Sequence, residues 1–128
     1  MKITQFTDYS LRLLLHLAHN RERAVTVREV ADYYGISADH LKKIVRQLAE
    51  LGHVRTVRGK NGGLLLARDP KDINLGRLFR DEENLALLPC FEGDGRCPVR
   101  DCKLRGLVDR ALDAFLAVLE GQTLGDIL

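Results

Sequence analysis

The three cysteines of the chain lie close together, in the segment CFEGDGRCPVRDC (residues 90–102). Cys90, Cys97 and Cys102 follow the pattern C-x6-C-x4-C, and because their number is odd, any pairing leaves one thiol over. Clustered thiolates are soft ligands that can hold an iron–sulfur cluster or zinc. Structural zinc sites usually use C-x2-C knuckles, which this segment lacks. The wide spacing therefore suits a larger cluster.

Three cysteines leave a four-ligand site one ligand short. No histidine follows His53 in the chain, so the local sequence supplies no imidazole. The fourth ligand must be remote or come from solvent, and the candidates are Asp8, His16, His19, His40, a carboxylate of the loop itself, or water. Free cysteines that merely fill space are the alternative, since such residues are often buried. A space-filling role accounts poorly for three cysteines in a polar loop that also contains two of the three prolines of the chain.

Composition indicates an ordinary globular protein. The chain has 128 residues, of which 45% are hydrophobic and 30% charged, and is most simply one domain. No apolar run approaches the length of a membrane span. The early stretch LRLLLHLA contains Arg12 and His16 and has no small-residue cleavage site after it, so it is interpreted as a core helix. We expect a cytoplasmic protein with reduced thiols, where clustered cysteines favour metal or redox chemistry over disulfides.

The net charge of +2 is unevenly distributed. Residues 37–63 contain six lysines and arginines against two acids, a balance of +4. Residues 81–101 contain six acids against two arginines, a balance of −4. The basic middle segment indicates a polyanionic partner, whereas the acidic segment around the cysteines does not suit a second nucleic-acid surface.

The first half of the chain predicts a winged helix-turn-helix. Residues 4–19 have apolar residues at helical period. Thr26 and Glu29 predict a capping box for a short helix that ends at Gly35, and Ser37 predicts the cap of a third helix that ends at Gly52. VRTV and LLLA then predict two short strands joined by the glycine-containing turn RGKNGG. A helix-turn-helix followed by a basic hairpin is a winged helix.

The second half predicts a helix over residues 74–88, a cysteine loop over 89–102 and a long helix over 102–119. The wide apolar stripe of the long helix extends past a compact winged-helix core, so we expect it to pack against its twin in a homodimer. The tail TLGDIL predicts one more capped turn. The fold class is therefore mainly α with a small β-hairpin. Residues 1–72 form the DNA-binding region, and residues 73–128 hold the cysteine loop and the dimerisation helix, in one compact chain.

The order of these elements favours DNA binding over an ordinary solvated basic face. Short polar residues at the start of the third helix can approach base edges, while its basic flank meets phosphates. Arg58 at the shoulder of the hairpin could enter a narrow minor groove. The chain lacks the P-loop pattern, and no nucleophile–base pair or paired carboxylates indicate an enzyme. The candidate DNA-contacting residues are Ser37, Asp39, His40, Lys42, Lys43, Arg46, Arg55, Arg58, Lys60 and Asn61.

Three stretches together resemble the winged-helix iron–sulfur transcription regulators of the NsrR and IscR type. They are MKITQFTDYSLRLLLHLA, SADHLKKIVRQLAELGHVRTVRGKNGGLLLARDP and the cysteine loop, and the resemblance covers nearly the whole chain. It implies a homodimer with crossing C-terminal helices, one cluster per subunit held by three cysteines, and a roughly palindromic operator. In the IscR branch a histidine follows the last cysteine, whereas here KLRG follows Cys102. The FTDY segment resembles the nitric-oxide-sensing branch, in which the aspartate at the position of Asp8 reaches the cluster of the partner subunit.

The resemblance implies a repressor that releases DNA when nitric oxide attacks a 4Fe–4S cluster bound by Cys90, Cys97, Cys102 and the partner's Asp8. A 2Fe–2S cluster is compatible with the same residues. One alternative is a regulator of the same fold that responds to iron or cluster supply, as in the iron-responsive branch, which also has three cysteines. Another is a winged-helix protein with structural zinc. An enzyme or electron carrier would not need the basic hairpin.

Overall fold

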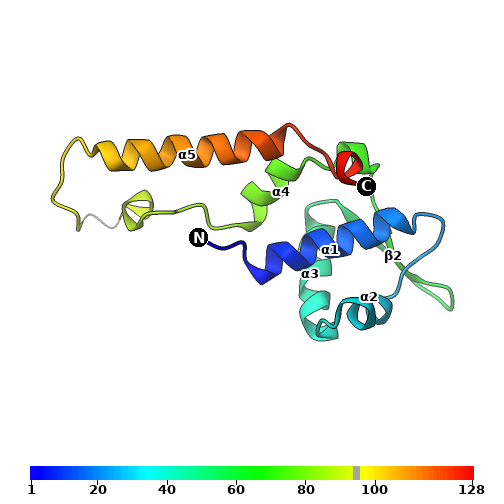
Figure 1. Ribbon diagram of the computed structural model, residues 1–128. Coiled ribbons are helices and arrows are strands. Elements are labelled where there is room, and N and C mark those ends of the chain that lie inside the picture. Colours follow the sequence, from blue (N-terminus) through cyan, green and yellow to red (C-terminus); the bar gives the residue numbers. More distant parts are fainter. Residues whose placement is uncertain (94–95) are drawn as a thin grey trace.

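The computed structural model describes residues 1–93 and 96–128 (Figure 1). Helices α1 to α3 and the hairpin form one body, while α5 extends away from it, with its C-terminal end near the body and the cysteine loop at its far end (Figure 1). No helix in the described residues is long and apolar enough to cross a membrane. The elements are α1 (Gln5–His19), α2 (Val27–Tyr34), α3 (Ala38–Glu50), β1 (Val54–Val57), β2 (Gly63–Leu66), α4 (Leu75–Glu82) and α5 (Lys103–Glu120), with short 3-10 turns at Pro70–Asp72, Pro89–Glu92 and Leu124–Ile127.

The winged helix-turn-helix expected from the sequence is confirmed. The side chains of Thr4, Thr26 and Ser37 cap the first three helices by accepting backbone N–H bonds. Gly35 ends α2 in the left-handed conformation, with φ of 65°, which suits glycine. The apolar stripe that helical periodicity predicts for α3 is buried except at Leu51, which is half-buried. It consists of Leu41, Ile44, Val45, Leu48 and Leu51. The core of the three helices is formed mainly by Leu13, Leu14, Leu17, Val30, Leu41, Ile44 and Leu48.

The hairpin is fixed to the loop before α2 by one β-bridge. Strands β1 and β2 pair antiparallel, with Val54 opposite Leu66 and Val57 opposite Gly63. Val25 exchanges two backbone hydrogen bonds with Leu64, of 3.0 and 2.7 Å. A Cβ at Gly63 would lie 2.6 Å from the Val25 carbonyl oxygen, so this close approach requires glycine. The two-stranded hairpin is therefore held to the helical body by this single β-bridge.

Helix α4 is shorter than the prediction of residues 74–88, because it ends at Glu82. Glu83 leaves the helical conformation, and its carboxylate accepts hydrogen bonds from the Thr4 backbone N–H at 2.8 Å and the Thr4 hydroxyl at 3.0 Å. The Asn84 side chain then accepts the Ala86 N–H in a short turn at 2.9 Å. These contacts favour an extended segment up to the Pro89 turn. The partner that ends the helix lies 79 residues away in sequence, so local periodicity could not reveal it.

The long helix α5 is tied to the body at its C-terminal end. Leu75 N–H donates to the Gln122 carbonyl at 3.0 Å, and Leu124 N–H donates to the Ile73 carbonyl at 2.8 Å. The capped turn expected in the tail is present, with Thr123 and Asp126 forming a capping box. Leu116 is the buried residue of α5. The apolar stripe predicted from the sequence did not include it and consisted of Leu104, Leu107, Val108, Ala111, Leu112, Phe115 and Leu119. Much of the predicted apolar stripe is exposed in the single chain, as at Leu104, Leu107, Ala111 and Phe115.

Glycine at position 76 permits the close contact between α4 and the end of α5. A Cβ there would lie 2.6 Å from the backbone nitrogen and 2.7 Å from the Cα of Glu120. We expect Gly76→Ala to lower the free energy of unfolding by about 2 kcal/mol, because backbone would have to move. Urea unfolding at fixed protein concentration measures this effect.

The matched control is Gly106→Ala in α5, where the added Cβ would meet the flexible Arg110 side chain at 3.9 Å. It should raise the free energy of unfolding by about 0.5–1 kcal/mol, because alanine favours helix over glycine. If Gly76→Ala stabilises the protein as much as the control does, the close contact is not required.

Candidate cluster site and nucleic-acid interface

The three cysteines lie on the segment that joins α4 to α5. Cys90 lies in the Pro89–Glu92 turn and is half-buried, and Cys97 is exposed. Cys102 is the N-cap residue of α5, where its Sγ accepts the Arg105 N–H at 3.4 Å. Hydrogen bonds to sulfur are also used by proteins to tune iron–sulfur clusters. Asp94 and Gly95 lie outside the described residues. Asp94 is the loop carboxylate closest in sequence to Cys97, so this candidate for the fourth ligand is not described.

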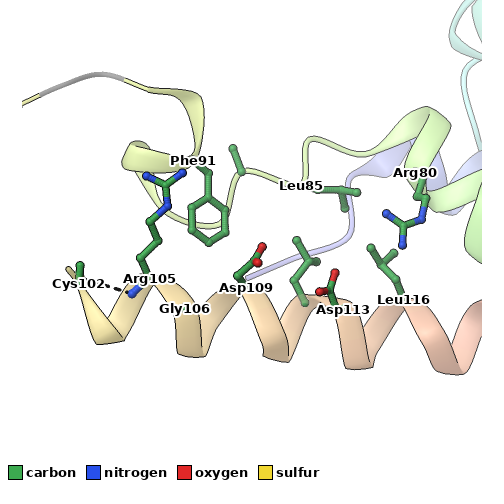
Figure 2. Close-up of a pocket in the computed structure, with 11 residues that line it drawn as sticks. Arg80, Leu85, Phe91, Cys102, Arg105, Gly106, Asp109, Asp113 and Leu116 are labelled. Atoms are coloured by element: carbon green, nitrogen blue, oxygen red, sulfur yellow. Dashed lines mark hydrogen bonds between the residues drawn. The ribbon is translucent and has the colours of Figure 1, made fainter. Parts of the chain in front are cut away.

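A groove of about 640 Å³ adjoins Cys102, between α5 and residues 85–91 (Figure 2). The Arg105 side chain extends from α5 toward Phe91, and its guanidinium carbon lies 5.6 Å from the ring centroid. This cation–π contact holds the turn that carries Cys90 against the first turn of α5, which begins after Cys102. Asp109 and Asp113 line the same groove farther along α5.

The packing of the described residues does not assemble a complete metal site. No group of three His, Cys, Asp or Glu side chains in residues 1–93 and 96–128 is placed to hold a metal ion. Asp8 lies in the first turn of α1, where its carboxylate pairs with Arg12 at 3.1 Å. In Figure 1, α1 lies well away from the cysteine loop at the far end of α5. Within one chain, Asp8 is therefore separate from the cysteines.

The donor set still fits an iron–sulfur cluster. Three thiols on one exposed segment are soft ligands, and Cys102 already accepts a backbone N–H. The histidines are a poorer choice for the fourth ligand. His16 is buried with Nε2 3.3 Å from a Glu29 carboxylate oxygen, and His40 packs on Tyr9 at a centroid distance of 5.2 Å.

The basic side chains of α3 lie on its solvent face. Lys42, Lys43 and Arg46 are exposed, as are Ser37 and Asp39 at the start of the helix. The Ser37 hydroxyl accepts the His40 N–H at 3.4 Å, so this serine also caps the helix. His40 is half-buried against Phe6 and Tyr9 of α1, so only part of its ring remains accessible. The face thus presents a polar N-terminal turn and a basic flank, as the sequence suggested.

The tip of the hairpin is a glycine-dependent turn that exposes Arg58, Lys60 and Asn61. Gly59 has φ of 111°, and its carbonyl accepts the Gly62 N–H at 3.0 Å. Residues with a side chain rarely adopt such a backbone φ, so glycine allows the chain to reverse here and to expose its basic neighbours.

Arg55 and Asn61 line a second groove, of about 480 Å³, between the hairpin and residues 21–24. Arg21 and Arg23 line it too, which the sequence analysis did not foresee. The charged run HNRER (residues 19–23) was the available signal, but its position beside the hairpin depends on the Val25–Leu64 bridge.

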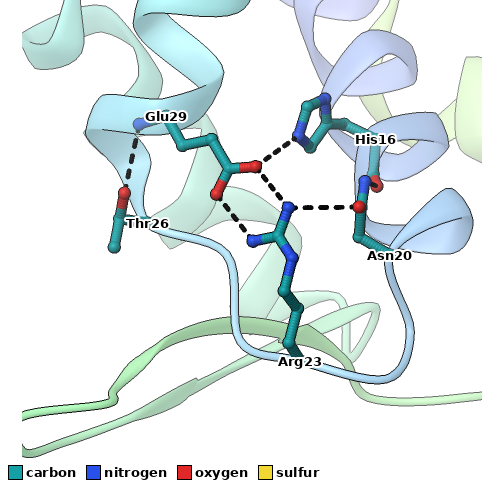
Figure 3. Close-up of polar contacts among 5 residues, drawn as sticks. All are labelled: His16, Asn20, Arg23, Thr26 and Glu29. Atoms are coloured by element: carbon teal, nitrogen blue, oxygen red, sulfur yellow. Dashed lines mark hydrogen bonds and ion pairs between the residues drawn. The ribbon is translucent and has the colours of Figure 1, made fainter.

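A polar network fixes α2 against α1 (Figure 3). Arg23 donates to both Glu29 carboxylate oxygens, at 2.8 and 2.6 Å, and also to Asn20. The hydrogen bond from Arg23, with His16 adding to it, lowers the pKa of Glu29 to about 2. The expected capping box is therefore only half formed. Thr26 accepts the Glu29 N–H at 3.1 Å, but the carboxylate of Glu29 binds Arg23 and not the Thr26 backbone.

Known proteins are similar to this chain over its whole length. The Rrf2 family model, described as an iron-dependent transcriptional regulator, matches residues 3–128. HTH-type transcriptional regulators named NsrR from Shouchella clausii and Bacillus subtilis are 42% and 40% identical, over all of this chain and 89% and 90% of their own lengths.

Two solved structures share the fold over 99% of this chain. The IscR structure from T. potens has a TM-score of 0.82 at 25% identity and is covered over 85% of its length. CymR, the global cysteine regulator of B. subtilis, has a TM-score of 0.81 at 27% identity and is covered over 95%.

Proposed function

The chain belongs to the Rrf2 family of transcriptional regulators, and on that basis we propose that it is a nitric-oxide-responsive repressor. It is a regulator and not an enzyme. The observation that carries the proposal is the identity of about 40% to NsrR proteins over the whole chain, which includes the three-cysteine segment. The proposed setting is the cytoplasm, where thiols stay reduced.

In the proposed complex, DNA meets the face formed by α3 and the hairpin. Lys42, Lys43 and Arg46 neutralise phosphates beside the major groove, while Ser37 and Asp39 lie at the helix end that approaches base edges. Arg58 extends from the hairpin toward the minor groove. A two-fold dimer would present two such faces to the half-sites of a roughly palindromic operator.

The second copy would pack along α5. Its exposed apolar stripe, which we call the α5 seam, repeats at the spacing of a helix–helix contact. Ala111 and Ala114 lie at the middle of the seam, where small side chains let two helices approach closely. Leaving the larger residues in water is unfavourable, since Leu107 is 55% and Val118 71% exposed. The seam comprises Leu104, Leu107, Ala111, Ala114, Phe115 and Val118.

In this proposal Cys90, Cys97 and Cys102 hold an iron–sulfur cluster, 4Fe–4S in preference to 2Fe–2S, with Asp8 from the partner subunit as fourth ligand. When bound, the cluster supplies iron that can react with nitric oxide. The separation of Asp8 from its own cysteines supports a ligand that acts across the dimer. To reach the partner, the Asp8 carboxylate exchanges Arg12 for that contact. A hard carboxylate is a weak ligand for such iron and is readily released.

Release of Asp8 frees α1 of one subunit from the cysteine loop of the other. Because α1 packs on α3 and on α4, a shift of α1 changes where the two α3 helices stand relative to the operator. Coupling between two such sites is typically worth about 1–3 kcal/mol.

An iron-responsive regulator remains the second candidate, because the matching family model is described as iron-dependent. The same cysteines would then report iron supply, and cluster loss would follow iron limitation more closely than nitric oxide. A structural zinc site would leave the protein colourless and insensitive to nitric oxide.

Substitution of Arg58 tests the hairpin contact. We expect Arg58→Ala to weaken operator binding about tenfold and to reduce the salt dependence by about one ion, because one phosphate or groove contact is lost. Fluorescence anisotropy at several salt concentrations measures both quantities. Arg110→Ala, an exposed position of α5, is the control and should leave affinity unchanged. Equal effects of the two substitutions would exclude a specific role for Arg58.

The seam is tested by adding a charge to its middle. Leu107→Glu should weaken the dimer by about 100-fold, because two buried carboxylates would face an apolar surface. Ala117→Glu places the same side chain on another exposed side of α5 and should leave the dimer intact. Analytical ultracentrifugation over a range of concentrations measures dissociation. A dimer that tolerates Leu107→Glu does not use the seam.

The sensor assignment is tested by absorption spectra of anaerobically purified protein during titration with nitric oxide. We expect a coloured protein that bleaches and then releases operator DNA. Cys97→Ala should be colourless because a ligand is missing. Asp8→Ala should keep its colour but bleach at a different rate.

Asp32→Ala is the control for Asp8→Ala, since Asp32 forms a similar pair with Arg28 one helical turn away, at 3.9 Å. Bleaching under iron chelation but not with nitric oxide would favour the iron-responsive candidate. A protein that remains colourless after cluster reconstitution would overturn the iron–sulfur proposal and leave the DNA-binding part to be tested separately.

A further inference from the structure

A carboxyl group is buried at the contact between α4 and α1. Both oxygens of the Glu82 carboxyl are inaccessible to solvent, and no partner in the described residues makes a hydrogen bond of good geometry with them. The Ser10 hydroxyl of α1 is likewise buried without such a partner. An unsatisfied buried polar group is costly, and an ionised one much more so.

Glu83, the next residue, has the opposite environment. Its carboxylate binds the Thr4 backbone N–H and hydroxyl at the start of α1, where the N-terminal end of a helix favours negative charge. Glu82 instead lies in the last turn of α4, where the C-terminal end of a helix disfavours negative charge. Both adjacent glutamates therefore face α1, but only Glu83 has hydrogen-bond donors and a favourable helix end beside its carboxylate.

The groups around Glu82 shift its pKa in different directions. The pKa of Glu82 is raised to about 7, mainly by burial and in smaller part by the negative charges of Glu83 and Asp81 on the same segment. The nearby Ser10 hydroxyl opposes this shift. Burial is also the main cause that lowers the pKa of His53, at the corner between α3 and β1, and the charge of Asp81 opposes that shift.

We propose that Glu82 is a proton-sensitive contact between the winged helix and the C-terminal half of the chain. When protonated, it packs against Ser10 and keeps α1 on α4. When ionised, it draws in water and loosens that contact, so that α1 can move. The effect on operator affinity rests on the proposed function, whereas the titration of Glu82 and the loosening of α1 do not.

The direction of the pH dependence follows from the raised pKa. The closed contact binds more protons at Glu82 than the open one does, so the contact is most stable below about pH 4.5 and weakens as pH rises toward 7. With a pKa of about 7 when closed and 4.5 when open, the open-to-closed ratio rises about tenfold between pH 6 and pH 8.

The first measurement is the titration of the Glu82 carboxyl by carbon NMR on the full chain, with the free energy of unfolding followed over the same pH range. Glu82→Gln, a neutral isostere, should remove this component of the pH dependence. Ser10→Ala should move the midpoint upward, because the opposing hydroxyl is gone. Glu83→Gln should move it downward, because a neighbouring negative charge is gone.

Operator affinity provides the second measurement, between pH 6 and pH 8. The wild-type protein should lose more affinity over this range than Glu82→Gln, and the difference approaches about tenfold where the open form predominates. All other ionisable side chains are the same in both proteins, so the difference between the two profiles reports on Glu82.

Titration of Glu82 near pH 4.5, or an unchanged pH dependence of stability in Glu82→Gln, would overturn the proposal. If Glu82→Gln does not fold, the opposite shifts of Ser10→Ala and Glu83→Gln decide the question, and midpoints that do not move would overturn it. If no variant binds operator DNA while the stability profile shifts as expected, the contact is supported and the proposed function fails instead.

Discussion

The attachment of the C-terminal end of α5 to the segment before α4 is the contact on which the rest of the arrangement depends. Besides the two backbone bonds that join residues 73–75 to 122–124, the Asn74 side chain donates to the Glu120 carbonyl at 2.8 Å and Arg80 binds the Glu120 carboxylate. Most of α5 is exposed beyond this attachment. The helix is therefore fixed at the winged-helix end and unsupported toward the cysteine loop, except by α4 and the Phe91 turn.

Helix α1 provides the second connection between the two halves. It packs on α3 on one side and meets the end of α4 on the other. The α4 contact has an apolar part, since Leu75 and Leu78 belong to the same buried core as the leucines of α1. It also has a polar part, in which Glu83 binds Thr4 and Glu82 lies beside Ser10. The polar part changes with local charge, so it is the part of this junction that can respond to protonation.

Much of the winged helix could be predicted from the sequence, because its determinants are local. Thr26, Gly35 and Ser37 act within a few residues of their own helices. The missed features depend on distant partners. Glu83 ends α4 by binding Thr4, and Glu29 binds Arg23 in place of its own helix end. Leu116 is buried only because α4 lies against that side of α5. Periodicity shows that a helix has an apolar side, but not which part of it faces a neighbour.

The cysteine loop follows a different rule from the helices. Its chemistry could be predicted from residue type, whereas the placement of its thiols is only partly set by the chain's own packing. Cys102 is fixed as a helix cap and Cys90 by the contact of Phe91 with Arg105, but Cys97 is exposed between them. The free energy of binding the metal group must therefore bring the third thiol into place, as at other metal sites that form on binding. In the proposed sensor, the same free energy positions the thiols and engages Asp8 of the partner subunit. Because the chain alone does not fix all three thiols, loss of the bound group would change the loop and could be coupled to DNA release.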